Sequence, residues 1–362
     1  ELMNASGITD RIVKMCNALV GHLRGGLGHV NIVANILFAG ISGSGVADAA
    51  ALGTILIPAM TKSGYSKSYA TAVTGAASII GPTIPPSIPM IVYGSVVNIS
   101  IAGLFATGIV PGVLMGVLMM VINYIISVKR NYQAASKRAP LSEILESLRE
   151  GVVALGMPAI ILGGILGGIF TPTEAAGIAV GYAAIVGFFI FRTLDIKILL
   201  QVLQRAVSTT GVSLLLVSVG GILSWVLASE QIPSSVAKFM LSIVETRYGF
   251  LFVTCIFLLI VGCFMDLTAS IIILAPILSP IAARLGINPL HFGIIMVLAL
   301  NIGLNTPPVG AVLFILSAVA SEKLESILSE IWPFLLCEVV TLFIVAFWPS
   351  LSMIVPRVLG FD

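Results

Sequence analysis

Charged side chains are scarce in this chain. Of its 362 residues, 58% are hydrophobic and only 9% are Asp, Glu, Lys or Arg, whereas a soluble domain carries about 25% charged residues. From Ser68 to Val128 there is no Asp, Glu, Lys, Arg or His at all. This composition excludes an ordinary soluble globular protein and predicts an all-α polytopic membrane protein.

Motifs for metal binding and for common enzyme chemistry are also missing. The four cysteines (Cys16, Cys255, Cys263 and Cys337) lie apart in apolar segments, without a CxxC pair or a Cys/His cluster, so we expect buried thiols. There is no HExxH, no GxSG with a partner His and no paired intramembrane Asp. The basic residues lie at span ends, so the net charge of +2 does not indicate nucleic-acid binding. We therefore predict neither an enzyme nor an organic cofactor.

What the sequence does contain is a series of apolar segments, several of them too broken to cross a membrane simply. We predict a re-entrant hairpin over 28–61 and a second one over 249–283. Each precedes a helix broken at a Pro-Pro pair, over 68–100 and 291–320. Simple spans are predicted at 103–128, 152–170, 175–191, 206–228 and 332–355, and an amphipathic helix on the cytoplasmic surface at 141–150.

The basic residues support this topology. Most of the 18 Lys and Arg residues fall on one side of the membrane, which the positive-inside rule makes cytoplasmic. The two hairpins then open to opposite faces. We divide the chain into a first repeat (1–128), a scaffold part with the amphipathic helix and two spans (129–205), and a second repeat (206–362).

Matched positions in the two halves indicate an internal repeat. At one common offset, the second half repeats four features of the first: Pro58/Pro280, Gly64/Gly286, Gly81/Gly303 and Pro85-Pro86/Pro307-Pro308. Glycine and proline are common here, so these matches alone would allow coincidence, but the opposite orientation of the hairpins favours a true repeat. Inverted repeats with discontinuous helices are the signature of secondary transporters.

The proline breaks can carry chemistry. Pro86 and Pro308 remove a backbone donor and disturb the preceding turn, which frees carbonyls near Gly81, Ile84, Gly303 and Thr306 for a hard cation such as sodium. The helix that starts beyond each break points its N–H groups at the gap, which suits a carboxylate. Proline kinks kept for packing are the alternative, and two related breaks, each paired with a polar hairpin turn, make it less favoured.

The hairpin turns supply further oxygens. Ser42 and Ser44 offer hydroxyls in a glycine-rich turn, although small residues there could instead serve a tight helix contact. Asp266 is the one acid between two apolar arms, and an intramembrane acid is a functional candidate by default. We favour a sodium ligand, with Thr268 nearby, and a helix N-cap is the compatible alternative.

Other polar residues in the spans have weaker claims to function. Asp48 could be a ligand or structural. The stripe of Thr71, Thr74 and Ser78 could line a substrate path or only satisfy helix carbonyls; Asn301 and Asn305 form the counterpart in the second copy. Asn31 and Asn35 are expected to tie the hairpin arms together. Glu174 belongs to a "TPTE" capping box, for which we predict a structural role.

Five motifs, in order along the chain, resemble one membrane-protein family. They are "GISGSGVADAAALGTILIPAM", "GPTIPPSIPMIVYG", "GIFTPTEAAGIAVGY", "GCFMDLTASIIILAPI" and "TPPVG". Together they resemble the large membrane subunit of tripartite ATP-independent periplasmic (TRAP) transporters, in the ion transporter superfamily. Large subunits of that family usually have further spans before this segment, so we expect the N-terminus to be incomplete.

The resemblance implies sodium-driven uptake of a small organic acid, such as a C4-dicarboxylate, keto acid or sugar acid, by an elevator motion. It also implies a small TRAP membrane subunit, a periplasmic substrate-binding protein and a bacterial or archaeal inner membrane. The implied sodium ligands are Ser42, Ser44, Gly81, Ile84 and Pro86 for one ion, and Asp266, Thr268, Gly303 and Thr306 for another. Between them, we expect the substrate at Gly43, Pro85, Ser87, Asn305 and Pro307.

Other functions remain to be distinguished from this one. A stand-alone sodium/dicarboxylate symporter would work without a binding protein. A channel would need a continuous pore, which hairpins closing from both faces argue against.

Overall fold

The computed structural model describes the chain except for residues 1, 6, 135–138, 231–245, 308–309 and 362. The described residues form helices and connecting turns, and no strand occurs among them. Six of the described helices are long and apolar enough to cross a membrane. The predicted class, an all-α polytopic membrane protein, is therefore confirmed.

A helical hairpin lies where the sequence predicts the first re-entrant segment. It consists of α3 (Gly26–Ser42) and α4 (Gly45–Lys62). The turn between them has two local causes. Gly43 adopts a left-handed conformation with φ 62°, which costs glycine little. Ser44 then caps α4, because its Oγ accepts the Ala47 N–H at 3.4 Å.

The helix that follows this hairpin is broken in its middle. α5 (Lys67–Ser78) and α6 (Ile88–Val97) are separated by turns over residues 79–87, which contain three of the prolines. The second half restarts at Ser87, whose Oγ accepts the Met90 N–H at 3.4 Å, with Pro89 in the first turn. The long helix α7 (Ile101–Lys129) completes this part.

The second half of the chain repeats this order. A hairpin of α12 (Arg247–Phe264) and α13 (Leu267–Arg284) is followed by α14 (Pro289–Gly303) and α15 (Ala311–Ala320). The chain between the last two helices is not helical where it is described. α16 (Leu324–Phe347) and α17 (Pro349–Val358) then close the chain.

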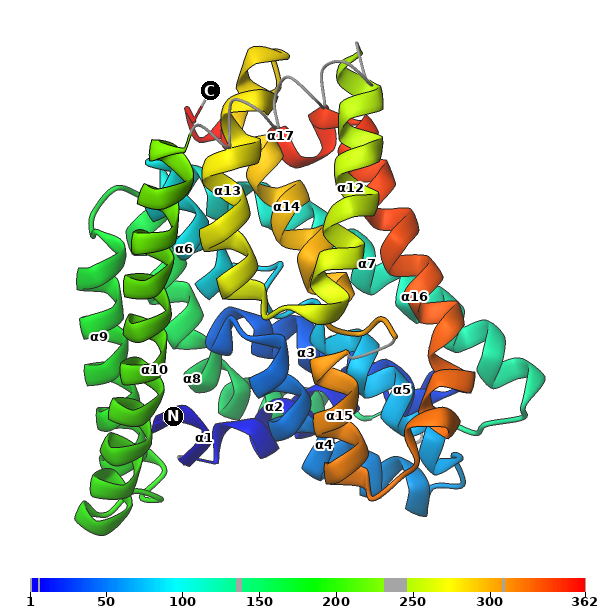
Figure 1. Cartoon of the computed structure of the whole chain (residues 1–362). Coiled ribbons are helices and arrows are strands. Elements are labelled where there is room, and N and C mark those ends of the chain that lie inside the picture. The colour runs from blue at the N-terminus through cyan, green and yellow to red at the C-terminus, as the bar shows by residue number, and fades with distance from the viewer. Residues whose placement is uncertain (1, 6, 135–138, 231–245, 308–309, 362) are drawn as a thin grey trace.

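The two hairpins approach the centre of the molecule from opposite sides (Figure 1). α12 and α13 descend from the top of the view, while α3 and α4 occupy the lower half. The broken helices lie beside them, with α6 and α14 above the centre and α15 below it. Both helix breaks and both hairpin tips therefore lie near the middle of the molecule.

The remaining helices form the left side of the same view (Figure 1). They are α1 (Leu2–Ala5), α2 (Ile8–Val20), α8 (Leu141–Leu166), α9 (Pro172–Ile185) with a π-turn at Val186–Ile190, and α10 (Ile196–Ser229). The predicted capping box is present: the Glu174 carboxylate accepts the Thr171 N–H at 2.8 Å, and Thr171 Oγ accepts the Glu174 N–H at 3.3 Å. The structural role predicted for Glu174 is confirmed.

Several predicted boundaries differ from the structure. The span predicted at 206–228 is part of α10, which already begins at Ile196. The segment 141–150 is not a separate surface helix, because α8 continues through Gly151, where it packs against Met15 of α2. The predicted span 332–355 is divided instead at Trp348. Pro349 cannot donate the next helical hydrogen bond and begins a new helix.

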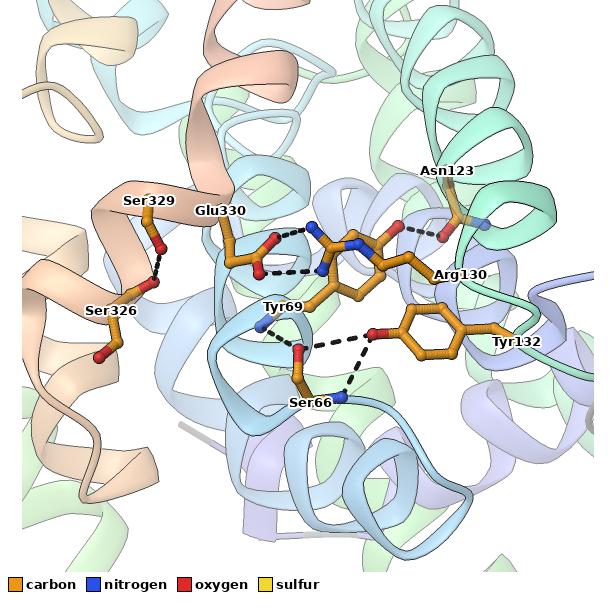
Figure 2. Close-up of polar contacts among 8 residues, drawn as sticks. All are labelled: Ser66, Tyr69, Asn123, Arg130, Tyr132, Ser326, Ser329 and Glu330. Atoms are coloured by element: carbon orange, nitrogen blue, oxygen red, sulfur yellow. Dashed lines mark hydrogen bonds and ion pairs between the residues drawn. The ribbon is translucent and has the colours of Figure 1, made fainter.

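A polar and aromatic cluster ties the ends of α5, α7 and α16 together (Figure 2). Arg130 forms a two-point ion pair with Glu330, at 2.9 and 2.7 Å, and its guanidinium lies 5.3 Å from the ring centroid of Tyr69. The Tyr69 hydroxyl donates to Asn123 Oδ1 at 2.9 Å, and Tyr132 packs against the same ring. Paired charges and satisfied hydroxyls make this cluster a rigid joint between three helices.

The buried hydroxyl of this cluster gives a testable stability effect. Tyr69→Phe should lower the free energy of unfolding by about 1–3 kcal/mol, because Asn123 Oδ1 then loses its donor in a buried site. Thermal unfolding of the purified protein in detergent measures the change. Tyr132→Phe is the matched control with a smaller expected effect, since its hydroxyl forms 3.4–3.5 Å bonds to the exposed Ser66 and lies beside the exposed Arg130, so no buried group loses a donor. Equal melting temperatures for wild type and Tyr69→Phe would contradict the assignment.

Candidate functional site

The tip of the first hairpin is packed directly against the first helix break. The Ile88 N–H donates to the Gly43 carbonyl at 3.4 Å. A Cβ on Gly43 would lie 2.5 Å from the Pro86 carbonyl oxygen, so only glycine permits this approach. The predicted sodium residue Pro86 and the predicted substrate residues Gly43 and Ser87 are thus neighbours.

Ser42 and Ser44 are linked to a buried acid at this tip. Ser42 Oγ donates to Asp48 Oδ1 and accepts the Ser44 N–H at 3.2 Å. Asp48 is fully buried, and its other oxygen, Oδ2, has no hydrogen-bond partner among the described residues. That oxygen faces Gly81, where an added Cβ would lie only 2.1 Å away. The structure therefore brings Ser42, Ser44 and Gly81 together around one carboxylate.

Asp48 belongs to this cluster, although the sequence leaves its role open between ligand and structure. A usable signal is present: an acid in an apolar segment, six residues after Ser42. What the sequence does not show is the approach of Gly81 to Asp48, because that contact depends on how the hairpin tip meets the break.

The first break is a compact series of turns. The N–H groups of Gly81 and Ile84 donate to Ser78 and Ile80 carbonyls at 3.1 and 2.9 Å. Ser87 Oγ donates to the Pro82 carbonyl, which closes the loop onto the start of α6. Pro85 is buried within it. The Ile84 side chain packs on Gly112 of α7, so a sodium role for Ile84 would rest on its carbonyl.

In the second hairpin, Asp266 caps α13. Its Oδ1 accepts the N–H groups of Thr268 at 2.9 Å and Ala269 at 3.2 Å, and its side chain is exposed. The predicted N-cap is confirmed. Thr268 enters this arrangement through its backbone N–H. A sodium role for Asp266 or Thr268 stays a prediction.

The second hairpin meets the second break through glycines. A Cβ on Gly303 of α14 would lie 2.4 Å from Gly262 Cα of α12, so the two backbones touch. Thr306 lies within the break, which starts after Gly303, and its Oγ1 donates to the Ile302 carbonyl at 2.9 Å. Pro307 is half-buried in the same turn. Pro308 is predicted from the sequence to disturb the preceding helical turn, but it lies outside the described residues.

Two asparagines connect the break of each half to the helix that precedes the break of the other half. Asn301 Nδ2 donates to the Ile79 carbonyl at 2.6 Å, and Asn305 Nδ2 donates to the Gly75 carbonyl at 2.8 Å. Both asparagines are fully buried, and neither Oδ1 has a hydrogen-bond partner among the described residues. Asn305, a predicted substrate residue, therefore lies where α5 and α14 meet.

The hydroxyl stripe on α5 is satisfied within its own helix. Thr71, Thr74 and Ser78 each donate to a carbonyl three or four residues earlier, at 2.7–2.8 Å. Asn31 donates to Thr74 Oγ1 at 2.7 Å and contacts Met60 of the other hairpin arm, while Asn35 donates to Asn31. These bonds favour the alternative that the three hydroxyls only satisfy helix carbonyls and do not line a substrate path.

Comparison with known proteins identifies the family. A family model described as "Tripartite ATP-independent periplasmic transporter, DctM component" matches residues 1–351. The chain belongs to this TRAP transporter family. The large permease proteins of TRAP systems are transporter subunits, which confirms the prediction that the chain is not an enzyme.

Curated TRAP relatives match nearly the whole chain. It is 39% identical over 357 residues to the sialic acid TRAP transporter large permease protein SiaM of Vibrio cholerae, covering 99% of this chain and 83% of the relative. It is 41% identical over 358 residues to the C4-dicarboxylate large permease DctM of Pseudomonas aeruginosa, covering 99% and 84%. It is 37% identical over 354 residues to the 2,3-diketo-L-gulonate large permease YiaN of Escherichia coli, covering 98% and 83%.

The contact between Gly81 and Asp48 is open to direct test. Gly81→Ala should lower the uptake rate roughly tenfold or more, because a methyl group there overlaps the buried carboxylate and overpacking costs about 1–3 kcal/mol. Transport of labelled substrate by reconstituted protein measures it. Gly177→Ala is the control, since a Cβ at Gly177 of α9 meets nothing within 4 Å. Wild-type uptake by Gly81→Ala would show that the break tolerates displacement of the Asp48 carboxylate.

Proposed function

We propose that this TRAP subunit carries out sodium-coupled uptake of a small organic acid delivered by a periplasmic substrate-binding protein. One observation carries the proposal. Two hairpin tips reach two helix breaks near the middle of the molecule, and Asn301 and Asn305 bond the second broken helix to the first. Discontinuous helices at such a crossing are where secondary transporters hold ions and substrate.

Sodium is the coupling ion that suits these groups. Hard cations prefer oxygen ligands. The first tip offers hydroxyl and carbonyl oxygens at Ser42, Ser44 and Pro86, with the carboxyl group of Asp48 beside them. The second offers Thr306, the carbonyls near Gly303, and Asp266 with Thr268 on the hairpin. In the proposal, the two groups bind one sodium ion each.

The substrate is assigned to the space between these ion sites. Helices α6 and α15 begin at the two breaks, and helix N-termini favour anionic groups. The residues proposed to contact the substrate lie on the first hairpin tip and on the two breaks: Gly43, Pro85, Ser87, Asn305 and Pro307. The named substrates of the three relatives, sialic acid, C4-dicarboxylates and diketogulonate, are all organic acids.

The proposed movement is an elevator. The hairpins and broken helices would move as one body, because the asparagine pair links their breaks, while α8, α9 and α10 form the scaffold at the side of the molecule (Figure 1). The relatives' TRAP designation supports two partners, a small membrane subunit and a periplasmic binding protein, and an inner-membrane location.

Reconstitution tests the function. Proteoliposomes with this chain and its small subunit should accumulate substrate only with an inward sodium gradient and an added substrate-loaded binding protein. A potassium gradient of equal size is the control. Full uptake without the binding protein would favour a stand-alone sodium/dicarboxylate symporter, and flux that is indifferent to every coupled gradient would favour a channel.

Asp266 allows the capping and sodium roles to be separated. Asp266→Asn keeps a good N-cap but removes the charge, so the sodium concentration for half-maximal uptake should rise about tenfold or more, equal to about 1.4 kcal/mol. Asp195→Asn is the matched control, because Asp195 accepts the Ile198 N–H at 2.7 Å as an ordinary exposed cap. Unchanged sodium activation in Asp266→Asn would leave Asp266 with the capping role alone.

A further inference from the structure

Glu338 is a buried acid that the proposed sites do not use. It lies in the middle of α16 and is fully buried. Neither of its carboxyl oxygens makes a hydrogen bond of standard geometry with a described residue. The other acids of the same helix are placed differently: Glu330 is paired with Arg130, and Glu325 is exposed.

No described cation is placed to balance this charge. α16 packs against α5, α7, α12, α14, α15 and α17. Most charged or ionisable groups on these helices lie at or near the helix ends or are bound elsewhere: Lys67, Tyr69, Tyr124, Lys129, Tyr248, Arg247, Cys263, His291 and Arg357. Cys255 lies in the middle of α12, but its thiol cannot supply a positive charge. The side chains that interact with the Glu338 carboxyl are the Asn305 amide and the thiol of the neighbouring Cys337.

Asn305 is the polar side chain beside Glu338, and its own hydrogen bonds are incomplete. Its amide faces the carboxyl, and its Nδ2 is already used in the 2.8 Å bond to the Gly75 carbonyl. Its Oδ1 has no partner among the described residues. The two carboxyl oxygens of Glu338 and the amide oxygen of Asn305 are therefore buried on neighbouring side chains, and none of the three has a hydrogen-bond partner among the described residues.

Such a group of oxygens calls for a positive charge. An unpaired carboxylate in a low-dielectric interior costs several kcal/mol even after relaxation, and intramembrane acids survive by pairing or by binding an ion. One carboxylate matches one positive charge. A divalent ion would leave a net charge buried in the same place.

We propose that Glu338 and Asn305 form a buried site for a monovalent cation, a proton or Na⁺, that is filled and emptied during transport. It is distinct from the two ion sites at the hairpin tips. Asn305 is the link to the rest of the cycle, because the same side chain holds the Gly75 carbonyl of α5. Filling the site fixes Asn305 against Glu338 and so favours the contact between the two breaks.

Filling and emptying of the Glu338 site during transport rests on the proposed transport function. Binding of a cation at the site does not, because it can be measured without transport. Purified wild type, Glu338→Gln and Glu338→Asp would be compared by equilibrium ²²Na⁺ binding at acidic, neutral and alkaline pH. Proton release on sodium addition would be followed in weak buffer. Glu325→Gln, an exposed change on the same helix, is the matched control.

If sodium fills the site, Glu338→Gln binds one Na⁺ fewer than wild type. If a proton fills it, the sodium count stays the same and the wild-type proton release is lost. Glu338→Asp keeps the charge but withdraws it from Asn305, so it should weaken cation binding about tenfold; this variant decides the question should Glu338→Gln fail to fold. Wild-type sodium count and proton release in the folded variants would overturn the proposal. Wild-type uptake without sodium dependence would instead refute the proposed function.

Discussion

The structure depends on one constraint, which is that backbone polar groups at membrane depth need partners other than water. Continuous helices meet this need internally, and the two broken helices do not. The chain meets it locally through the turns of residues 79–87 and the serine caps, and across the repeats through Asn301 and Asn305. The carbonyls of Gly75 and Ile79 are thereby tied to the opposite half of the molecule. The break at which we propose that ligands bind also joins the two halves.

Three acids in the apolar segments follow the same constraint in different ways. Asp266 is exposed at a hairpin tip, and its carboxylate accepts hydrogen bonds from N–H groups of the helix that it caps. Asp48 is fully buried and has a hydroxyl on one oxygen only. Glu338 is fully buried and has an amide beside it. A carboxylate with fewer hydrogen-bond donors from the protein has a greater need for a bound cation. By this criterion Glu338 is the strongest candidate ion site, followed by Asp48 and then Asp266.

Local signals in the sequence predict much of this architecture. Helix breaks at Pro-Pro pairs, a hairpin turn at Gly43-Ser44 and the Thr171–Glu174 capping box all have causes within a few residues, so they are visible without the fold. The division at Trp348 was missed although Pro349 marks it, because the apolar run continues beyond it. The contacts of Asp48 with Gly81 and of Asn305 with Gly75 and Glu338 join distant segments. Periodicity along the chain contains no information on those meetings, which only packing decides.

The glycine contact between α12 and α14 has a thermodynamic consequence. At Gly262 and Gly303 the surfaces that touch are backbone, with no side-chain atoms between them. Side-chain burial usually costs rotamer freedom, up to about 2 kcal/mol for a long side chain, and this contact has none to lose or regain. Forming this contact therefore leaves side-chain entropy almost unchanged. It holds α12 and α14 together at a point where the association has almost no entropic penalty from side chains.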